Sequence, residues 1–181
     1  MIIIVLYEMK YRKCKTNPLN RGFKQNTIIS DLETKYENMI VNKKIQGGNS
    51  QRRPDVFIDR GDYCIIIEID ERQHRSGDYT SDNRDRTSEI IDDINGRSLV
   101  LIRFNPDSYK SSRKTFRSLF SKTRKDRLYR IGCPNKYEER LTLLKAIVDH
   151  YLCNSPSQKF IEHRLYFDNF DPNDILQTLY E

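Results

Sequence analysis

The feature that most constrains the fold is the apolar run Ile65-Ile66-Ile67, which leads into Glu68-Ile69-Asp70. A strand over 63–70 would have apolar side chains on both faces, as strands do when helices cover both sides of a sheet. A second strand is expected over 54–58, and residues 59–62 would form the tight turn between the two. The sequence therefore predicts a β-hairpin at the centre of an α/β fold.

Other apolar patterns predict the elements around this hairpin. Helices are expected over 26–39, from Ser81 or Asp82 to Gly96, over 138–154 and over 174–180. Strands are expected over 2–7, 98–104 and 160–167. This order predicts an α/β fold with a mixed sheet flanked by helices, a basic insert and a C-terminal helix-strand extension. The expected divisions are an N-terminal strand and loop over 1–24, a domain over 25–168 and a tail over 169–181.

A basic segment over 110–130 carries more positive charge than the whole chain. It has nine Lys and Arg residues and one acid, Asp126, which is +8 against a formal net charge of +6 for all 181 residues. Such a segment, expected to be partly helical, favours a polyanion partner, although a solvated insert without a partner is the alternative. The candidate phosphate contacts in it are Lys110, Arg113, Lys114, Arg117, Arg124, Lys125 and Arg127.

Three carboxylates are expected to converge at one end of the hairpin. Glu68 and Asp70 share one face of the second strand, and Asp55 stands at the start of the first. Charged groups on an otherwise apolar strand are costly to bury unless they are paired or bind a metal. Carboxylate oxygens suit Mg²⁺ or Mn²⁺, so Asp55, Glu68 and Asp70 are candidate metal ligands and catalytic residues. For any one of them alone, an ordinary strand end remains the alternative.

Neighbouring basic residues complete the candidate site. His74 follows four residues after Asp70 and could act as a general base. Arg53, Arg84 and Arg103 are candidate phosphate contacts, Arg84 (or Arg86 beside it) from the start of a helix and Arg103 from within an apolar strand. The alternatives are a solvated helix start for Arg84 and a salt bridge to a carboxylate for Arg103.

The four cysteines stand alone and show no CxxC spacing, which argues against a structural zinc site. The apolar opening of the chain is too short for a secretion signal, and no stretch is long enough to span a bilayer. We therefore expect an intracellular protein, cytoplasmic or nuclear, without a membrane partner. The sequence gives no indication of the oligomeric state.

The sequence of these motifs resembles the PD-(D/E)XK nuclease superfamily, with Asp70 where the usual lysine would stand. It is more similar to the branch of very-short-patch repair endonucleases and phage homing endonucleases, which lack that lysine and carry a histidine where His74 lies. Segments 47–55, 65–74 and 102–109 also look like uncharacterised proteins from giant viruses and algae, so a virus-encoded protein is among the expected sources. The resemblance covers about 25–168.

The resemblance implies a restriction-endonuclease-like fold and a metal-dependent endonuclease that hydrolyses DNA, with duplex DNA as the expected partner. It makes Asp55 the main metal ligand, Glu68 the acid of the second strand and His74 the catalytic histidine. Repair-like or homing roles follow from the branch by analogy.

One departure leaves alternatives open. These nucleases often carry an acid on the first helix, and the corresponding position here is Gln25. A second hypothesis is therefore a weakened or inactive nucleic-acid-binding protein of the same fold. A third is a structural module in which the acids are ordinary salt-bridge partners.

Overall fold

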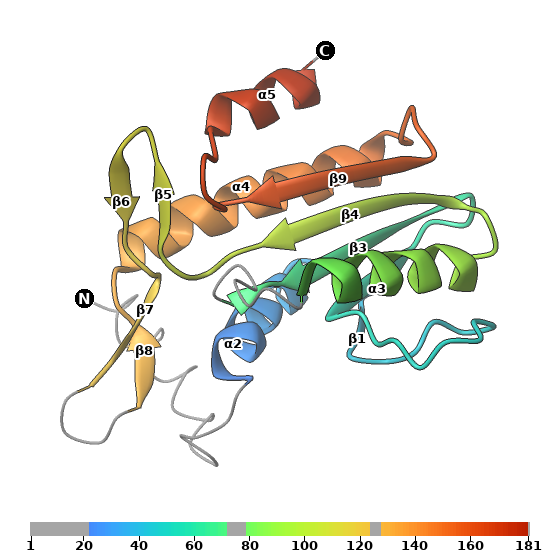
Figure 1. Ribbon diagram of the computed structural model, residues 1–181, viewed down its shortest axis with the longest axis horizontal. Coiled ribbons are helices and arrows are strands. Elements are labelled where there is room, and N and C mark those ends of the chain that lie inside the picture. Colours follow the sequence, from blue (N-terminus) through green and yellow to red (C-terminus); the bar gives the residue numbers. More distant parts are fainter. Residues whose placement is uncertain (1–21, 72–78, 124–127, 181) are drawn as a thin grey trace.

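The central sheet is built around the predicted hairpin (Figure 1). The computed structural model describes residues 22–71, 79–123 and 128–180. The five strands lie in the order β1-β2-β3-β4-β9. β1 and β2 are antiparallel, as are β2 and β3, whereas β4 is parallel to β3 and β9 is parallel to β4. The predicted mixed sheet is therefore confirmed. The strand bounds are β1 (Ile40–Val41), β2 (Val56–Asp59), β3 (Tyr63–Ile69), β4 (Ser98–Phe104) and β9 (Phe160–Leu165).

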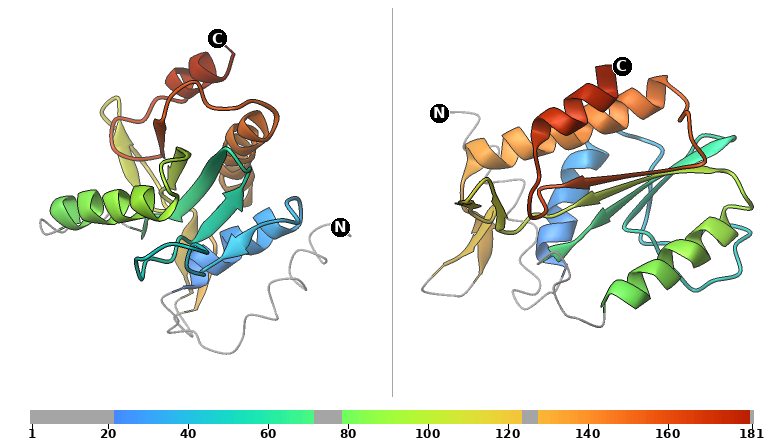
Figure 2. Two further views of the ribbon diagram at one scale, coloured as in Figure 1. Left: turned by 90° about the vertical axis from the view of Figure 1, so that its right-hand side faces the viewer. Right: turned by 45° about the horizontal axis from the view of Figure 1, so that its top comes forward.

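Helices cover both faces of β3, whose seven residues are all buried. One face of the sheet packs against α2 (Phe23–Glu33) and α4 (Pro134–Cys153), and Ile65, Ile67 and Ile69 point into that core. The other face packs against α3 (Tyr79–Asp93) through Cys64 and Ile66. Figure 2 shows α3 on the opposite side of the sheet from α2 and α4. The prediction from the isoleucine run, a strand covered on both sides, is thus confirmed.

The predicted helices are present, with shifted ends. α2 ends at Glu33 rather than at residue 39, because the backbone N–H groups of Lys35 and Tyr36 both bond the Leu32 carbonyl. Tyr36 is still buried, and its hydroxyl donates to Asp149 of α4 at 2.9 Å. The apolar spacing in the sequence therefore extends beyond the end of α2, because it reflects which side chains are buried and not only which residues are helical.

The other helices begin earlier than the apolar pattern indicated. α4 starts at Pro134 instead of residue 138, and α5 (Pro172–Tyr180) starts two residues before the expected 174. Proline suits the first helical position, where its missing N–H would have no partner within the helix. α3 begins at Tyr79, and Gly96 follows its end with a φ of 70°.

The basic insert forms hairpins, so the expected helical content is wrong for its described residues. β5 (Tyr109–Ser111) pairs with β6 (Lys114–Phe116), and β7 (Phe120–Lys122) pairs with β8 (Tyr129–Ile131). Ser112 and Arg113 both have positive φ, as two-residue hairpin turns require. Tyr109 and Phe116 stack across the first hairpin at 4.6 Å between ring centroids. Such cross-strand aromatic pairs stabilise antiparallel pairing.

Several predictions fall on residues outside the described ranges. These are the strand over 2–7, His74, and the insert residues Arg124, Lys125 and Arg127. In the part of the chain that is described, no helix is long and apolar enough to cross a bilayer.

Candidate functional site

The candidate acids gather where β2 begins and β3 ends. Val56 pairs with Ile67 in the hairpin, so Asp55 continues the pairing opposite Glu68. On the other side of β3, Glu68 pairs with Arg103 of β4. Asp70 follows directly after β3, and its backbone N–H bonds the carbonyl of Phe104 at 2.9 Å. The sheet register therefore brings the predicted acids and Arg103 to one edge of the sheet.

Both carboxylate oxygens of Asp55 accept hydrogen bonds. One oxygen, Oδ2, accepts from the backbone N–H of Ile69 at 2.7 Å. The other, Oδ1, accepts from the side-chain amide of Gln25 at 2.7 Å, and the same Gln25 nitrogen donates to Asn42 at 3.1 Å. Gln25, singled out in the sequence as a departure, thus reaches the site from the first turn of α2. These bonds fix the plane of the Asp55 carboxylate.

Glu68 is a buried acid with charged neighbours. Its exposed fraction is 8%. Arg86 of α3 donates from one nitrogen, Nη2, to both Glu68 oxygens at 2.9 and 3.0 Å, and also to the Arg53 carbonyl at 3.3 Å. Burial, followed by the negative charge of Asp55 and with a smaller contribution from Asp70, raises the pKa of Glu68 to about 7, although Arg86 opposes the rise. Glu68 therefore gains and loses a proton near neutral pH.

Asp70 is held by a different arginine in a more enclosed setting. Arg103 Nε donates to Asp70 Oδ2, and the two side chains are only 8% and 4% exposed. Burial lowers the pKa of Arg103, but the hydrogen bond and charge of Asp70 outweigh it, so the net shift is upward. Arg103 also lies 3.9 Å from Glu162 of β9. The structure thus places Arg103 in the salt bridge that the sequence left open as an alternative to phosphate binding.

A divalent cation needs oxygen ligands, and the three acids differ in how far they can supply them. Among the described residues, no group of three or more His, Cys, Asp and Glu side chains is arranged to hold a metal ion. Asp55 and Glu68 face each other at the hairpin end, whereas Asp70 is directed to Arg103. Two carboxylates with excess negative charge fit a cation such as Mg²⁺, which commonly takes one or two protein carboxylates and completes its shell with water and substrate phosphate.

Comparison of the chain with models of known protein families, with curated proteins and with solved structures gives no match.

Unlike the buried Arg103, the other predicted phosphate contacts whose side chains are described lie on the surface around this end of the sheet. Arg53 is exposed, directly before Pro54 and Asp55. Four residues separate β4 from β5, and Figure 1 shows the hairpins of the insert beyond the end of the sheet to which β4 points. Four of the predicted contacts in its described part are exposed, namely Lys110, Arg113, Lys114 and Arg117. The backbone of Arg84 lies in α3, but its side chain is outside the described set.

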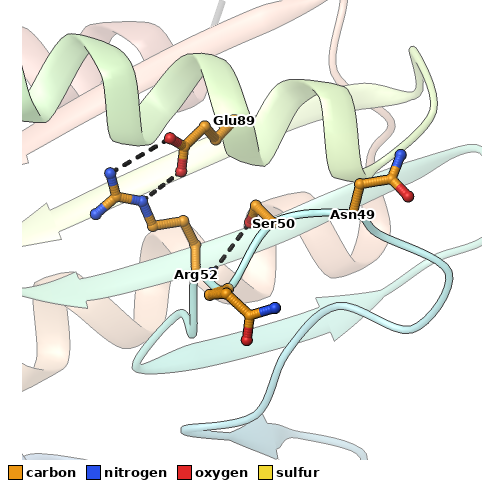
Figure 3. A pocket seen from close by; sticks show the side chains of 5 residues that line it. Asn49, Ser50, Arg52 and Glu89 are labelled. Atoms are coloured by element: carbon orange, nitrogen blue, oxygen red, sulfur yellow. Dashed lines mark hydrogen bonds and ion pairs between the residues drawn. The ribbon is translucent and has the colours of Figure 1, made fainter.

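A shallow hollow of about 450 Å³ lies beside α3, a short distance along the chain from Asp55 (Figure 3). It is lined by Asn49, Ser50, Gln51, Arg52 and Glu89. Arg52 reaches across it to Glu89 of α3, and Ser50 accepts a hydrogen bond from the Arg52 backbone N–H at 3.0 Å. The hollow is therefore lined by an ion pair and a loop, and we assign it no chemistry.

The contacts of the residues just before Gln25 were not predicted, because the expected helix began at residue 26. Lys24 is buried, and its ammonium lies 2.7 Å from Asp107 and 3.3 Å from Glu71. The Phe23 ring stacks on Tyr129 of the insert at 6.0 Å between centroids. A single helical turn thus contacts the insert, the segments after β3 and β4, and Asp55. A lysine within an apolar helix face would have been the only sequence signal.

Proposed function

We propose that this protein is a metal-dependent nuclease that hydrolyses phosphodiester bonds in DNA. The observation that carries the proposal is the acid pair Asp55 and Glu68. Glu68 is buried, its pKa is raised to about 7, and Asp55 lies opposite it across the hairpin. Ionisable groups perturbed by burial and like charge are typical of sites that bind cations or transfer protons. The resemblance to the very-short-patch and homing endonuclease branch supports the same function.

Each residue of the site would have a separate role in hydrolysis. Asp55 and Glu68 would hold Mg²⁺ or Mn²⁺, which when bound polarises the phosphate and lowers the pKa of a bound water. The Ile69 N–H and Gln25 orient Asp55. Exposed basic residues of the insert would hold the DNA backbone through its phosphates. His74 stays a predicted general base on sequence grounds, since it lies outside the described residues.

Nicking of supercoiled plasmid DNA tests this proposal. The wild-type protein is expected to nick in Mg²⁺ or Mn²⁺ and to stop when EDTA is added. Asp55→Asn and Glu68→Gln are each expected to lower the rate by at least about 100-fold, because each removes a ligand charge. Lys35→Met is a matched control, since Lys35 pairs with Asp149 away from the acids. Equal nicking by the wild type and Asp55→Asn would refute the proposal.

A second candidate is a non-catalytic DNA-binding protein of the same fold. It is favoured by the donors already present on each acid: Gln25 on Asp55, Arg86 on Glu68 and Arg103 on Asp70. This protein would bind DNA without metal and cut none. Fluorescence anisotropy with a labelled duplex at increasing salt would detect such binding, and Lys114→Ser with Arg117→Ser should lower the slope of log affinity against log salt by about 2.

A further inference from the structure

The contact between Arg86 and Glu68 has a geometry that suits exchange. A single Arg86 nitrogen donates to both Glu68 oxygens. The guanidinium therefore occupies the position in front of the carboxylate that a cation bound to both oxygens would take. The Arg86 side chain is 30% exposed, whereas the Glu68 side chain is 10% exposed. The arginine therefore has a route to solvent that the acid lacks.

Phosphate is a strong competitor for this arginine. A phosphodiester offers two oxygens to a guanidinium, as the carboxylate of Glu68 does, and charge-assisted bonds of both kinds are comparable in strength. Arg86 also donates to the Arg53 carbonyl at 3.3 Å, so it lies beside the segment that leads into Asp55. A phosphate that approached Asp55 and Glu68 would thus pass within reach of Arg86.

We propose that Arg86 is a latch on the acid pair: it neutralises Glu68 in the free protein and moves to a DNA phosphate when substrate binds, which frees Glu68 for the cation. The inference rests on the proposed function and adds its regulation. Because linkage is reciprocal, a cation that takes Glu68 from Arg86 strengthens phosphate binding by the same factor by which bound phosphate strengthens cation binding.

The first experiment measures Mn²⁺ binding alone by calorimetry at pH 8, with no DNA present. Arg86→Gln is expected to bind Mn²⁺ roughly tenfold more tightly than the wild type, because two charge-assisted hydrogen bonds no longer compete. Glutamine keeps the helix propensity of the site, and an unchanged melting profile would show that the variant is folded. Arg52→Gln is the matched control, since Arg52 makes a similar pair with Glu89 of the same helix. Equal or weaker Mn²⁺ binding by Arg86→Gln overturns the latch.

The second experiment needs no metal. Affinity for a labelled duplex is measured in EDTA for the wild type, Glu68→Gln, Asp55→Asn, Arg86→Gln and the two double variants that combine Arg86→Gln with Glu68→Gln or with Asp55→Asn. Glu68→Gln is expected to bind about fivefold more tightly than Asp55→Asn, which removes the same charge without touching Arg86, and the gain should vanish in the Arg86→Gln background. Independent effects in this cycle, or no measurable DNA binding, overturn the latch.

The outcomes separate the latch from the proposed function. A wild-type protein that nicks DNA with metal, while Arg86→Gln binds Mn²⁺ no more tightly, loses only the latch. A protein that nicks no DNA but shows the coupling between Glu68 and Arg86 in the metal-free cycle keeps the latch as a DNA-binding device and loses the nuclease.

Discussion

Two arginine–carboxylate pairs lie at the end of β3, where their acids, Glu68 and Asp70, are two residues apart. They differ in the element that supplies the arginine. Arg103 reaches Asp70 from the neighbouring strand, and both side chains are almost fully buried. Arg86 reaches Glu68 from α3, and its side chain is 30% exposed. A pair between neighbouring strands is fixed by the sheet register, whereas a pair between a strand and a helix packed on the sheet can open without disturbing the sheet. The first pair is thus suited to hold structure, and the second to exchange partners.

The largest effect is expected from breaking the enclosed pair. Arg103→Met should lower the free energy of unfolding by about 3–5 kcal/mol, because it leaves the Asp70 charge buried without its compensating cation. Urea unfolding at pH 7 measures the loss. Adding Asp70→Asn to Arg103→Met should recover most of it, since the uncompensated charge is gone. A loss below about 1 kcal/mol would mean that the enclosed pair holds the sheet no better than a surface pair.

A medium effect is expected from Glu68 and should depend on pH. Its folded-state pKa, about 7, lies above its ordinary 4.5, so the folded chain binds this proton more tightly than the unfolded chain. The resulting stability is fully present below about pH 4.5 and is lost as the pH rises through 7. Glu68→Gln should therefore be more stable than the wild type at pH 8, by on the order of 2 kcal/mol, and close to it at pH 5.

Unfolding curves in EDTA at the two pH values measure this difference. EDTA is needed because a bound cation would stabilise the ionised acid. A Glu68→Gln variant that is less stable than the wild type at pH 8 would contradict the placement of Glu68 as a buried acid beside the negative charge of Asp55.

The smallest effect on stability is expected from opening the exchangeable pair. Arg86→Gln should change the free energy of unfolding by less than about 1 kcal/mol at pH 7, because the pair is partly solvated and Glu68 can take up a proton when its cation is lost. Urea unfolding beside Arg103→Met gives the direct comparison. If the two variants lose equal stability, the distinction between the pairs fails.

The sequence predicted the centre of the fold well, for a physical reason. The isoleucine run of β3 and the apolar run of β4 leave few ways to bury their side chains, so the hairpin and the helices over both faces followed. Glycine and proline set several ends, as at Gly96 and Pro134. The insert was misread because its hairpins depend on pairing between residues such as Tyr109 and Phe116, which a local pattern of charges does not reveal.

The sequence predicted which acids lie together at the site better than it predicted which arginine contacts each acid. Alternation along β3 correctly placed Glu68 and Asp70 on one face, because that follows from strand geometry alone. Which arginine meets which acid depends on the register between β3 and β4 and on the angle of α3. A local sequence pattern reveals neither the register nor the helix angle, so Arg86 was considered only as a phosphate contact.

The first turn of α2 has a mechanical consequence. Phe23, Lys24 and Gln25 are consecutive, yet they contact the insert, Asp107 with Glu71, and Asp55. Backbone hydrogen bonds such as Asn26 N–H to the Gly22 carbonyl, at 2.7 Å, make this turn a stiff unit. A displacement of the insert would therefore be transmitted through this turn to Asp55, and the buried ammonium of Lys24 would be its pivot.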